Sequence, residues 1–439
     1  MKIICAQQLA VFHSNEVHTA YWLQHIETCK GIAVHQLKFR PTNIDADQHF
    51  EKFPDVEGML KVSNFNFTFE KYFPDEYELL HNSTTDTLRN HLAEYTDTDT
   101  VFVISWIDFT ALTWLDVDFL LIDFPGKVMV DDSFESCPIR NNSMNTMLER
   151  QGYSTNKIGF FTNCPRKDLR IKDNNFYRNN WLHLTLTSDQ SARPNDIATF
   201  NKLDKVGLKD YSNKTYQFLS LNGHSTILRL QLICKLYSID ALSYDKYRYS
   251  MCSMEHQPEF IKYVTERTNI LQDNNDFYNG LFNKLFPKRL PGDVDEGRER
   301  DFFVSADWWN ESFFNVNVDT NQQYLRNDWV NISEKWMKQI LYYTPGININ
   351  EYTGLEQHHK DLGFKGYDAF WDHSYDSIDN YWDRIDAVAE VIKNMQNPTE
   401  AEWKQMMEIA EYNYNHFYDT HIPSLALSLR ESIQNLLDQ

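Results

Sequence analysis

The residues whose types and spacing most clearly suggest chemistry are Ser333-Glu334-Lys335. Ser333 is a favourable helix N-cap, because its hydroxyl can accept a hydrogen bond from a backbone N–H group of the first turn. A lysine in a first turn opposes the helix dipole unless an anion binds there, and the free N–H groups already attract anions. Glu334 could accept hydrogen bonds from hydroxyl groups, such as those of a ribose. The alternative is a solvent-exposed helix start with a local charge pair.

A second chemically suggestive stretch is the turn Asn222-Gly223-His224, which follows a predicted strand and precedes a helix that carries Arg229. A guanidinium group is planar and can bind a diphosphate through two parallel hydrogen bonds. Arg229 is therefore a candidate phosphate ligand. The alternative is a surface arginine on an amphipathic helix.

In the N-terminal half, acidic residues follow a predicted strand directly in Asp131-Asp132-Ser133-Phe134-Glu135. Acids at the carboxyl end of a parallel strand face the crevice where α/β proteins bind ligands. Asp132 or Glu135 could act as the general base for a hydroxyl group if burial raises its pKa. The alternative is a helix N-cap cluster, since Asp132 and Glu135 have the spacing of a capping box.

The sequence predicts no metal site and no bound cofactor. Adjacent histidines such as His358 and His359 point to different faces of a helix, and no His-Glu-x-x-His motif is present. The six cysteines form no Cys-x-x-Cys pair. Two Asp-x-Asp matches, Asp45-Ala46-Asp47 and Asp97-Thr98-Asp99, lie in polar stretches rather than after a strand.

The stretch from Ser333 to Ile349 also resembles a known family. Ser333-Glu334-Lys335, the amphipathic helix after it, Pro345 and the short strand Ile347–Ile349 are similar to the donor-binding segment of fucosyltransferase-like and exostosin-like glycosyltransferases. In those enzymes the helix follows a strand with an acidic residue, and Glu311 takes that place here. The strand, asparagine turn and arginine helix around Asn222 and Arg229 also resemble the family.

A downstream stretch resembles the "LGFKTF…DESYD" signature of glycosyltransferase-like proteins from phages and large viruses. The matching residues are Leu362–Tyr367 and Trp371–Asp376, and Arg384 fits the same pattern. Gly366-Tyr367 stands where the signature has Thr-Phe, and His373 stands where it has Glu. The resemblance covers roughly residues 215 to 395.

The resemblance implies a GT-B-like α/β fold, with two Rossmann-like domains facing a cleft and C-terminal helices crossing back to the first domain. It implies a metal-independent, inverting glycosyltransferase that uses a nucleotide-sugar as co-substrate. The acceptor could be a glycan, a small molecule or a hydroxymethylated DNA base. A catalytically inactive GT-B-like protein that binds nucleotides or sugars, or has a structural role, is the alternative. The implied donor-binding residues are Asn222, Arg229, Glu311, Ser333, Glu334 and Lys335.

The elements that must position these residues alternate between strands and helices, which predicts an α/β layered architecture. No Gly-x-Gly-x-x-Gly or P-loop motif is present, which disfavours a dinucleotide-binding domain and a P-loop NTPase. The predicted strands are Lys2–Ala6, Gly31–Phe39, Val101–Ser105, Phe119–Asp123, Lys127–Asp131, Lys157–Asn163, Trp181–Thr185, Tyr216–Leu221, Asp240–Asp245, Phe302–Ser305, Phe313–Val318 and Ile347–Ile349. The predicted helices are His18–Cys29, Thr85–Tyr95, Thr226–Tyr237, the segment after Ser333, Ser377–Met395, Ala401–Phe417 and Ser424–Leu437.

With 439 residues, the chain is long enough for two cores. We predict an acceptor-side domain at 1–210, a donor-binding domain at 211–395, and C-terminal helices at 396–439 that pack back on the first domain. The net charge of -21 argues against broad nonspecific DNA binding. The start of the chain lacks the apolar run of a signal peptide, and no membrane span is present, so a cytoplasmic location is expected, in the host cell for a viral protein.

Overall fold

The computed structural model of the chain describes residues 2–6, 33–37, 89, 92–105, 109, 114–131, 146, 148–162, 176–178, 210–222, 227–242, 247–249, 306–319, 334–350 and 353–439. The chain divides into two compact units. The first contains Met1–Thr187, Asp328–Asn331 and Ile422–Gln439, and the second contains Ser188–Asn327 and Ile332–His421. The division near residue 187 lies before the predicted boundary at 210, and residues 396–421 belong to the second unit.

The first unit contains a parallel sheet, as the apolar strand patterns predict. Its described strands are β1 (Lys2–Ala6), β2 (Ala33–Leu37), β3 (Thr100–Ser105), β4 (Lys127–Asp131), β5 (Ile158–Thr162) and β6 (Phe176–Arg178), in the order β2-β1-β3-β4-β5-β6. Phe102, Val128 and Phe160 pack on one face with α8 (Trp114–Asp118) and its neighbours. Val101 and Met129, which alternate with them, are also buried, so the sheet is covered on both faces as parallel sheets require.

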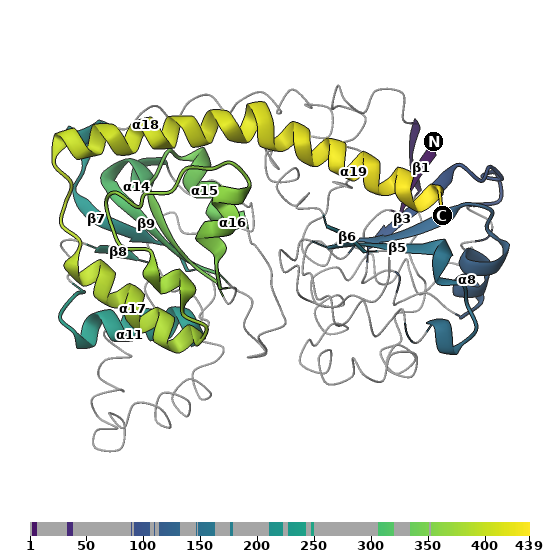
Figure 1. The fold of residues 1–439 in the computed structure, drawn as a ribbon, viewed down its shortest axis with the longest axis horizontal. Coiled ribbons are helices and arrows are strands. Elements are labelled where there is room, and N and C mark those ends of the chain that lie inside the picture. The colour runs from purple at the N-terminus through teal and green to yellow at the C-terminus, as the bar shows by residue number, and fades with distance from the viewer. Residues whose placement is uncertain are drawn as a thin grey trace, which may run out of the picture. The chain divides into compact units, whose positions relative to one another are not determined.

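The second unit contains a smaller parallel sheet between two layers of helices. Its described strands are β7 (Tyr216–Ser220), β8 (Tyr247–Tyr249), β9 (Ser312–Val318) and β10 (Gly346–Ile349), in the order β10-β9-β7-β8. In Figure 1, α11 (Ile227–Ser238) and α17 (Tyr381–Asn394) lie on one side of this sheet. On the other side lie α14 (Ala306–Glu311), α15 (Glu334–Leu341), α16 (Leu355–Asp361) and α18 (Glu400–His416).

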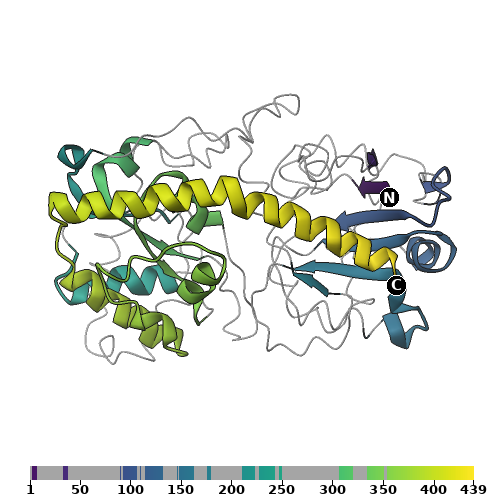
Figure 2. The same ribbon diagram turned by 45° about the horizontal axis from the view of Figure 1, so that its top comes forward.

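The C-terminal helices belong to different units although they follow one another without a break. The helix α18 ends in a π-helical turn, η8 (Phe417–His421), and α19 (Ile422–Leu437) starts at the next residue. Within the first unit, α19 packs against β3 and β4 (Figure 2). Among the described helices, none combines the length and the apolar character that crossing a membrane requires.

The α/β class and most of the predicted elements are confirmed, but two predicted strands are wrong. Phe119–Asp123 is a π-helical turn that continues α8, and three of its apolar residues point into the core. A short apolar run does not distinguish a buried strand from a buried helix. The strand predicted at Asp240–Asp245 is wrong over its described residues, 240–242, because Asp240 adopts a left-handed conformation (φ 55) that ends α11. The next described strand is β8. The predicted segments His18–Cys29, Trp181–Thr185 and Phe302–Ser305 lie outside the described residues.

Candidate functional site

Both sheets place their first strand between their second and third strands. The chain therefore leaves the first and third strands of each sheet in opposite directions, and a crevice opens at the carboxyl ends of those strands. In the second unit this switch point lies between β7 and β9. Asn222 follows β7 and Asp319 follows β9, and both are buried. The switch point is the position where α/β folds most often bind a ligand, so the side chains around it are candidates for a binding site.

Arg229 lies at this switch point. It occupies the first turn of α11, and its Nε and Nη2 atoms each donate a hydrogen bond of 3.0 Å to the carbonyl oxygen of Val318, the last residue of β9. The side chain is 1% exposed. The start of α11 is thereby fixed to the end of β9, and a positive charge lies directly behind the ends of the central strands.

The start of α15 lies at the same edge of the sheet. The strands β9 and β10 are parallel and α15 lies between them in sequence, so the helix must run antiparallel to the strands. Its first residues, Glu334 and Lys335, therefore lie on the carboxyl side of the sheet. Ser333 lies outside the described residues. The fold thus brings four of the six candidate donor-binding residues, Asn222, Arg229, Glu334 and Lys335, to one edge.

Glu311 is at the opposite edge. It is the last residue of α14, directly before β9, and its carboxylate accepts a 2.6 Å hydrogen bond from Arg248 Nη1. The seven residues of β9 separate it from the end of that strand, a distance of about 20 Å at the usual rise of a strand. The structure therefore does not bring Glu311 together with Asn222 and Arg229. Asp132 and Glu135 lie outside the described residues, after the carboxyl end of β4.

A buried polar face on β9 and β10 was not predicted. Asn315, Asn317 and Asp319 alternate with apolar residues on β9 and just beyond it, and Asn348 and Asn350 do the same on β10. Asn317 donates to Asn348 Oδ1 (3.3 Å), and Asn350 donates to Asp319 Oδ2 (2.5 Å). These side-chain pairs link the two strands residue by residue and support the parallel register of Asn317 with Asn348.

Arg384 holds the loop that follows β10. Its guanidinium donates to the carbonyl oxygens of Asn350 and Ile378 and to the hydroxyl of Thr353, and its side chain is 1% exposed. These bonds connect the end of β10, the approach to α16 and the start of α17. Arg384, which the family resemblance singled out, is therefore a central support of the second unit.

Asp376 caps α16. Its two carboxylate oxygens accept from the backbone N–H groups of Leu355 (3.0 Å) and Glu356 (2.9 Å). The N-cap of α17 is instead Asn380. Residue 354 is a glycine with φ 87, which has no capping side chain, so the cap must come from a distant part of the chain.

Glu356 and His373 form a buried polar pair beside this cap. Their side chains approach to 3.8 Å between Glu356 Oε2 and His373 Nδ1. Burial, with a smaller contribution from the charge of Asp376, raises the pKa of Glu356 to about 8. Burial lowers the pKa of His373. Both groups are therefore uncharged near neutral pH, and their contact is not an ion pair.

The two adjacent histidines lie in different surroundings, as expected for neighbours on a helix. His359 is buried and stacks on Trp336, with ring centroids 3.8 Å apart. Burial lowers the pKa of His359 well below its ordinary value. Within the described segments, no three His, Cys, Asp or Glu side chains gather in a way that could hold a metal ion.

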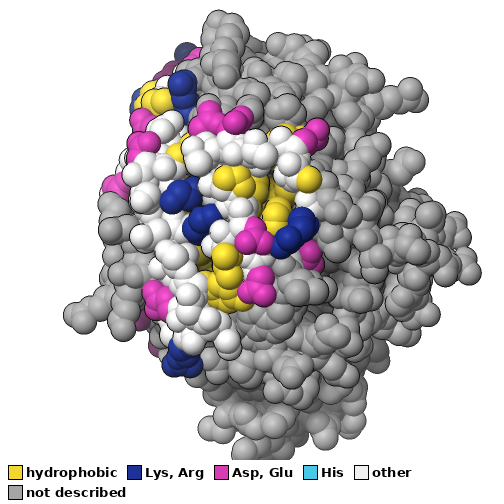
Figure 3. Space-filling model, turned by 90° about the vertical axis from the view of Figure 1, so that its right-hand side faces the viewer, with side chains coloured by type: hydrophobic (Ala, Val, Ile, Leu, Met, Phe, Trp, Pro, Cys, Tyr) yellow, Lys and Arg dark blue, Asp and Glu magenta, His cyan; other side chains and the backbone are white. Residues whose placement is uncertain are grey.

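On the face in Figure 3, basic and acidic side chains are interspersed with hydrophobic ones.

No protein-family model matches the chain, and no curated protein sequence matches it either.

Proposed function

We propose that the chain is a GT-B-type glycosyltransferase that moves a sugar from a nucleotide-sugar to an acceptor hydroxyl without a metal ion. The observation that carries the proposal is that Asn222, Arg229 and the start of α15 lie at the same carboxyl edge of a parallel sheet. A nucleoside diphosphate requires positive charge and N–H donors at its phosphates, and this edge offers both.

In the proposed reaction, Lys335 and the N–H groups at the start of α15 bind the diphosphate. Because negative charge grows on the leaving diphosphate in the transition state, these groups would stabilise the transition state more than the ground state. Arg229 is buried and holds Val318, so its contribution would be a fixed positive charge behind the strand ends. Glu334 would hold the ribose hydroxyls.

The acceptor side of the proposed reaction belongs to the first unit. Asp132 or Glu135 would take the proton from the acceptor hydroxyl as the hydroxyl oxygen attacks the sugar carbon from the face opposite the diphosphate. This direct displacement inverts the configuration at that carbon. The acceptor classes proposed are a glycan, a small molecule and a hydroxymethylated DNA base.

Lys335→Ala should weaken the binding of a nucleoside diphosphate about tenfold or more, since it removes the cation from the proposed phosphate site. Thermal shifts with UDP and GDP, with CMP for comparison and with or without EDTA, measure this. A diphosphate at about a hundred times its dissociation constant should stabilise the wild type by roughly 2.7 kcal/mol.

The matched control is Lys338→Ala, which removes the same side chain from the last turn of α15. Lys338→Ala should show the same thermal shift with a nucleoside diphosphate as the wild type, and EDTA should not change that shift. The proposal would be contradicted if no diphosphate stabilised the wild type, or if both lysine variants lost the shift equally.

A further inference from the structure

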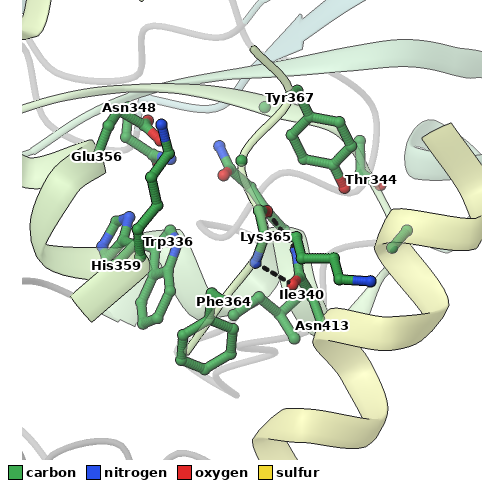
Figure 4. A pocket seen from close by; sticks show the side chains of 15 residues that line it. Trp336, Ile340, Thr344, Asn348, Glu356, His359, Phe364, Lys365, Tyr367 and Asn413 are labelled. Atoms are coloured by element: carbon green, nitrogen blue, oxygen red, sulfur yellow. Dashed lines mark hydrogen bonds between the residues drawn. The ribbon is translucent and has the colours of Figure 1, made fainter. Parts of the chain in front are cut away.

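A cavity lies on the helix-covered side of β10, away from the switch point between β7 and β9. Its volume is about 40 Å³, which is room for about three water molecules. Side chains of α15, β10, α16, α18 and the loop after α16 line it. In Figure 4, Asn348 and Glu356 lie together on one side, and the rings of Trp336 and His359 lie face to face below them. Lys365, Tyr367 and Asn413 lie across from them.

Two polar atoms of the cavity wall lack hydrogen-bond partners. Glu356 Oε1 and His359 Nε2 are both buried without a partner in the structure, and their residues are 8% and 4% exposed. They are three residues apart on α16, which places them on one face of the helix. A buried polar atom without a partner costs free energy, so a ligand that pairs both atoms is stabilised by doing so.

The positively charged groups of the lining are already engaged elsewhere. Lys360 Nζ donates to Asp368 at 2.6 Å, and Lys365 Nζ lies 3.9 Å from the centre of the Tyr412 ring. An anion would therefore find no available countercharge among the described lining residues. Glu356 is protonated near neutral pH and His359 is neutral, so these two residues offer no negative charge to a cation.

A hydroxyl group suits both unpaired atoms, because it can donate and accept at once. The rest of the wall is largely aromatic, with apolar surface from Trp336, Phe364 and Tyr367. The amides of Asn348 and Asn413 already have partners in Asn317 and in the backbone of Lys365. Two neighbouring hydroxyls on a short carbon chain match this combination in both size and polarity.

We propose that this cavity is a binding site for the vicinal hydroxyl groups of a small uncharged polyol, such as one edge of a sugar ring. The proposal does not depend on the transferase activity. The cavity and the donor site lie at different places on the sheet, so the two can be tested separately.

The test is ligand-observed NMR on the full chain with myo-inositol, methyl α-glucoside and glycerol as neutral probes. Gluconate and glucosamine serve as charged counterparts of similar size. We expect the neutral probes to bind and the charged ones to bind at least about tenfold more weakly. A methyl glucoside that binds more tightly than glycerol would identify a sugar as the ligand, and the reverse order would identify a free polyol.

Variants connect the binding to the two unpaired atoms. His359→Phe keeps a ring against Trp336 but removes the nitrogen, and Glu356→Leu removes the carboxyl group. Each should weaken polyol binding about tenfold. Glu356→Gln keeps an uncharged donor and acceptor and should bind within about threefold of the wild type. Glu390→Leu, on the exposed face of α17, is the control for the loss of an acid.

Glu356→Gln and His359→Phe preserve the size of the side chain, so their polyol binding can be measured even if Glu356→Leu fails to fold. The proposal would be overturned if no neutral polyol binds the wild type, or if the charged probes bind as tightly as the neutral ones. Unchanged binding by folded His359→Phe would overturn it as well. None of these outcomes bears on nucleotide binding at the donor site, which is tested separately.

Discussion

Arg384→Ala should lower the free energy of unfolding of the second unit by about 3–5 kcal/mol. The guanidinium is 1% exposed and donates to three separate stretches of chain: the end of β10, Thr353 and the turn at Ile378. Removing it leaves buried carbonyl oxygens without donors. It also removes a nearby positive charge from Asp376, whose pKa is raised by burial against the opposing effect of Arg384.

Urea unfolding followed by tryptophan fluorescence measures the effect, since many tryptophans, including Trp336, Trp371 and Trp382, are buried in the second unit. Arg384→Lys should recover only part of the loss, because an ammonium group cannot serve three sets of acceptors in a fixed fork. Lys393→Ala, on the exposed face of the same helix, is the matched control and should change little. A loss below about 1 kcal/mol in Arg384→Ala would show that the network is dispensable.

Glu356→Gln should change how stability depends on pH. The pKa of Glu356 is about 8 in the folded chain against an ordinary value of 4.5. Below 4.5 both the folded and the unfolded states hold the proton, and between 4.5 and 8 only the folded state does. The contribution of this carboxyl group is therefore fully present at low pH and is lost as pH rises through that window. The slope is up to about 1.4 kcal/mol per pH unit.

The measurement is the difference in unfolding free energy between the wild type and Glu356→Gln at a series of pH values from about 5 to 8. The difference is informative because other groups titrate too. The lowered pKa values of His359 and His373 make their contributions disappear as pH falls below about 6.5, which is the opposite direction. The unfolding free energy of Glu356→Gln should therefore increase relative to that of the wild type as pH rises.

The control for this experiment is Glu390→Gln, which changes an exposed acid and should show a difference that stays constant with pH. A constant difference for Glu356→Gln as well would mean that the carboxyl group ionises near its ordinary pKa. In that case Glu356 would carry a negative charge at neutral pH, and the cavity would favour a cation over a neutral ligand.

Much of the fold could be predicted because the strands of a parallel sheet are continuous apolar runs. Val101–Ser105 and Lys127–Asp131 were predicted from such runs, and they form β3 and β4. The run Phe119–Asp123 looks the same in sequence but continues a helix. What separates the two cases is the packing of Phe119, Leu120 and Leu121 against the sheet, which no local pattern contains.

The polar ladder shows a different limit. The alternation of Asn315, Asn317 and Asp319 with apolar residues is visible in the sequence, and it normally indicates a strand with one face in solvent. Here helices cover that face, and the amides are buried against Asn348, Asn350 and Gln339. The alternation could have predicted a polar face, but only the structure shows that it is internal.

The candidate site was predicted in part. The turn chemistry around Asn222 and the helix start at Glu334 identified two loops that lie at the same carboxyl edge of the sheet, because strand–helix turns of one parallel sheet share an edge. Glu311 was misplaced because it precedes β9, and the residue before a parallel strand lies at the other edge. The cavity around Glu356 escaped prediction since its walls come from five separate elements.

The most direct test of the central claim is donor turnover. The purified chain would be incubated with a panel of nucleotide-sugars and mixed acceptors, in EDTA, and the release of nucleoside diphosphate would be measured for the wild type, Lys335→Ala and Lys338→Ala. We predict release from one class of donor by the wild type and Lys338→Ala, and a strong loss in Lys335→Ala. Tight nucleotide binding without any release would instead indicate a binding protein. The absence of both binding and release would contradict the account of the switch-point site.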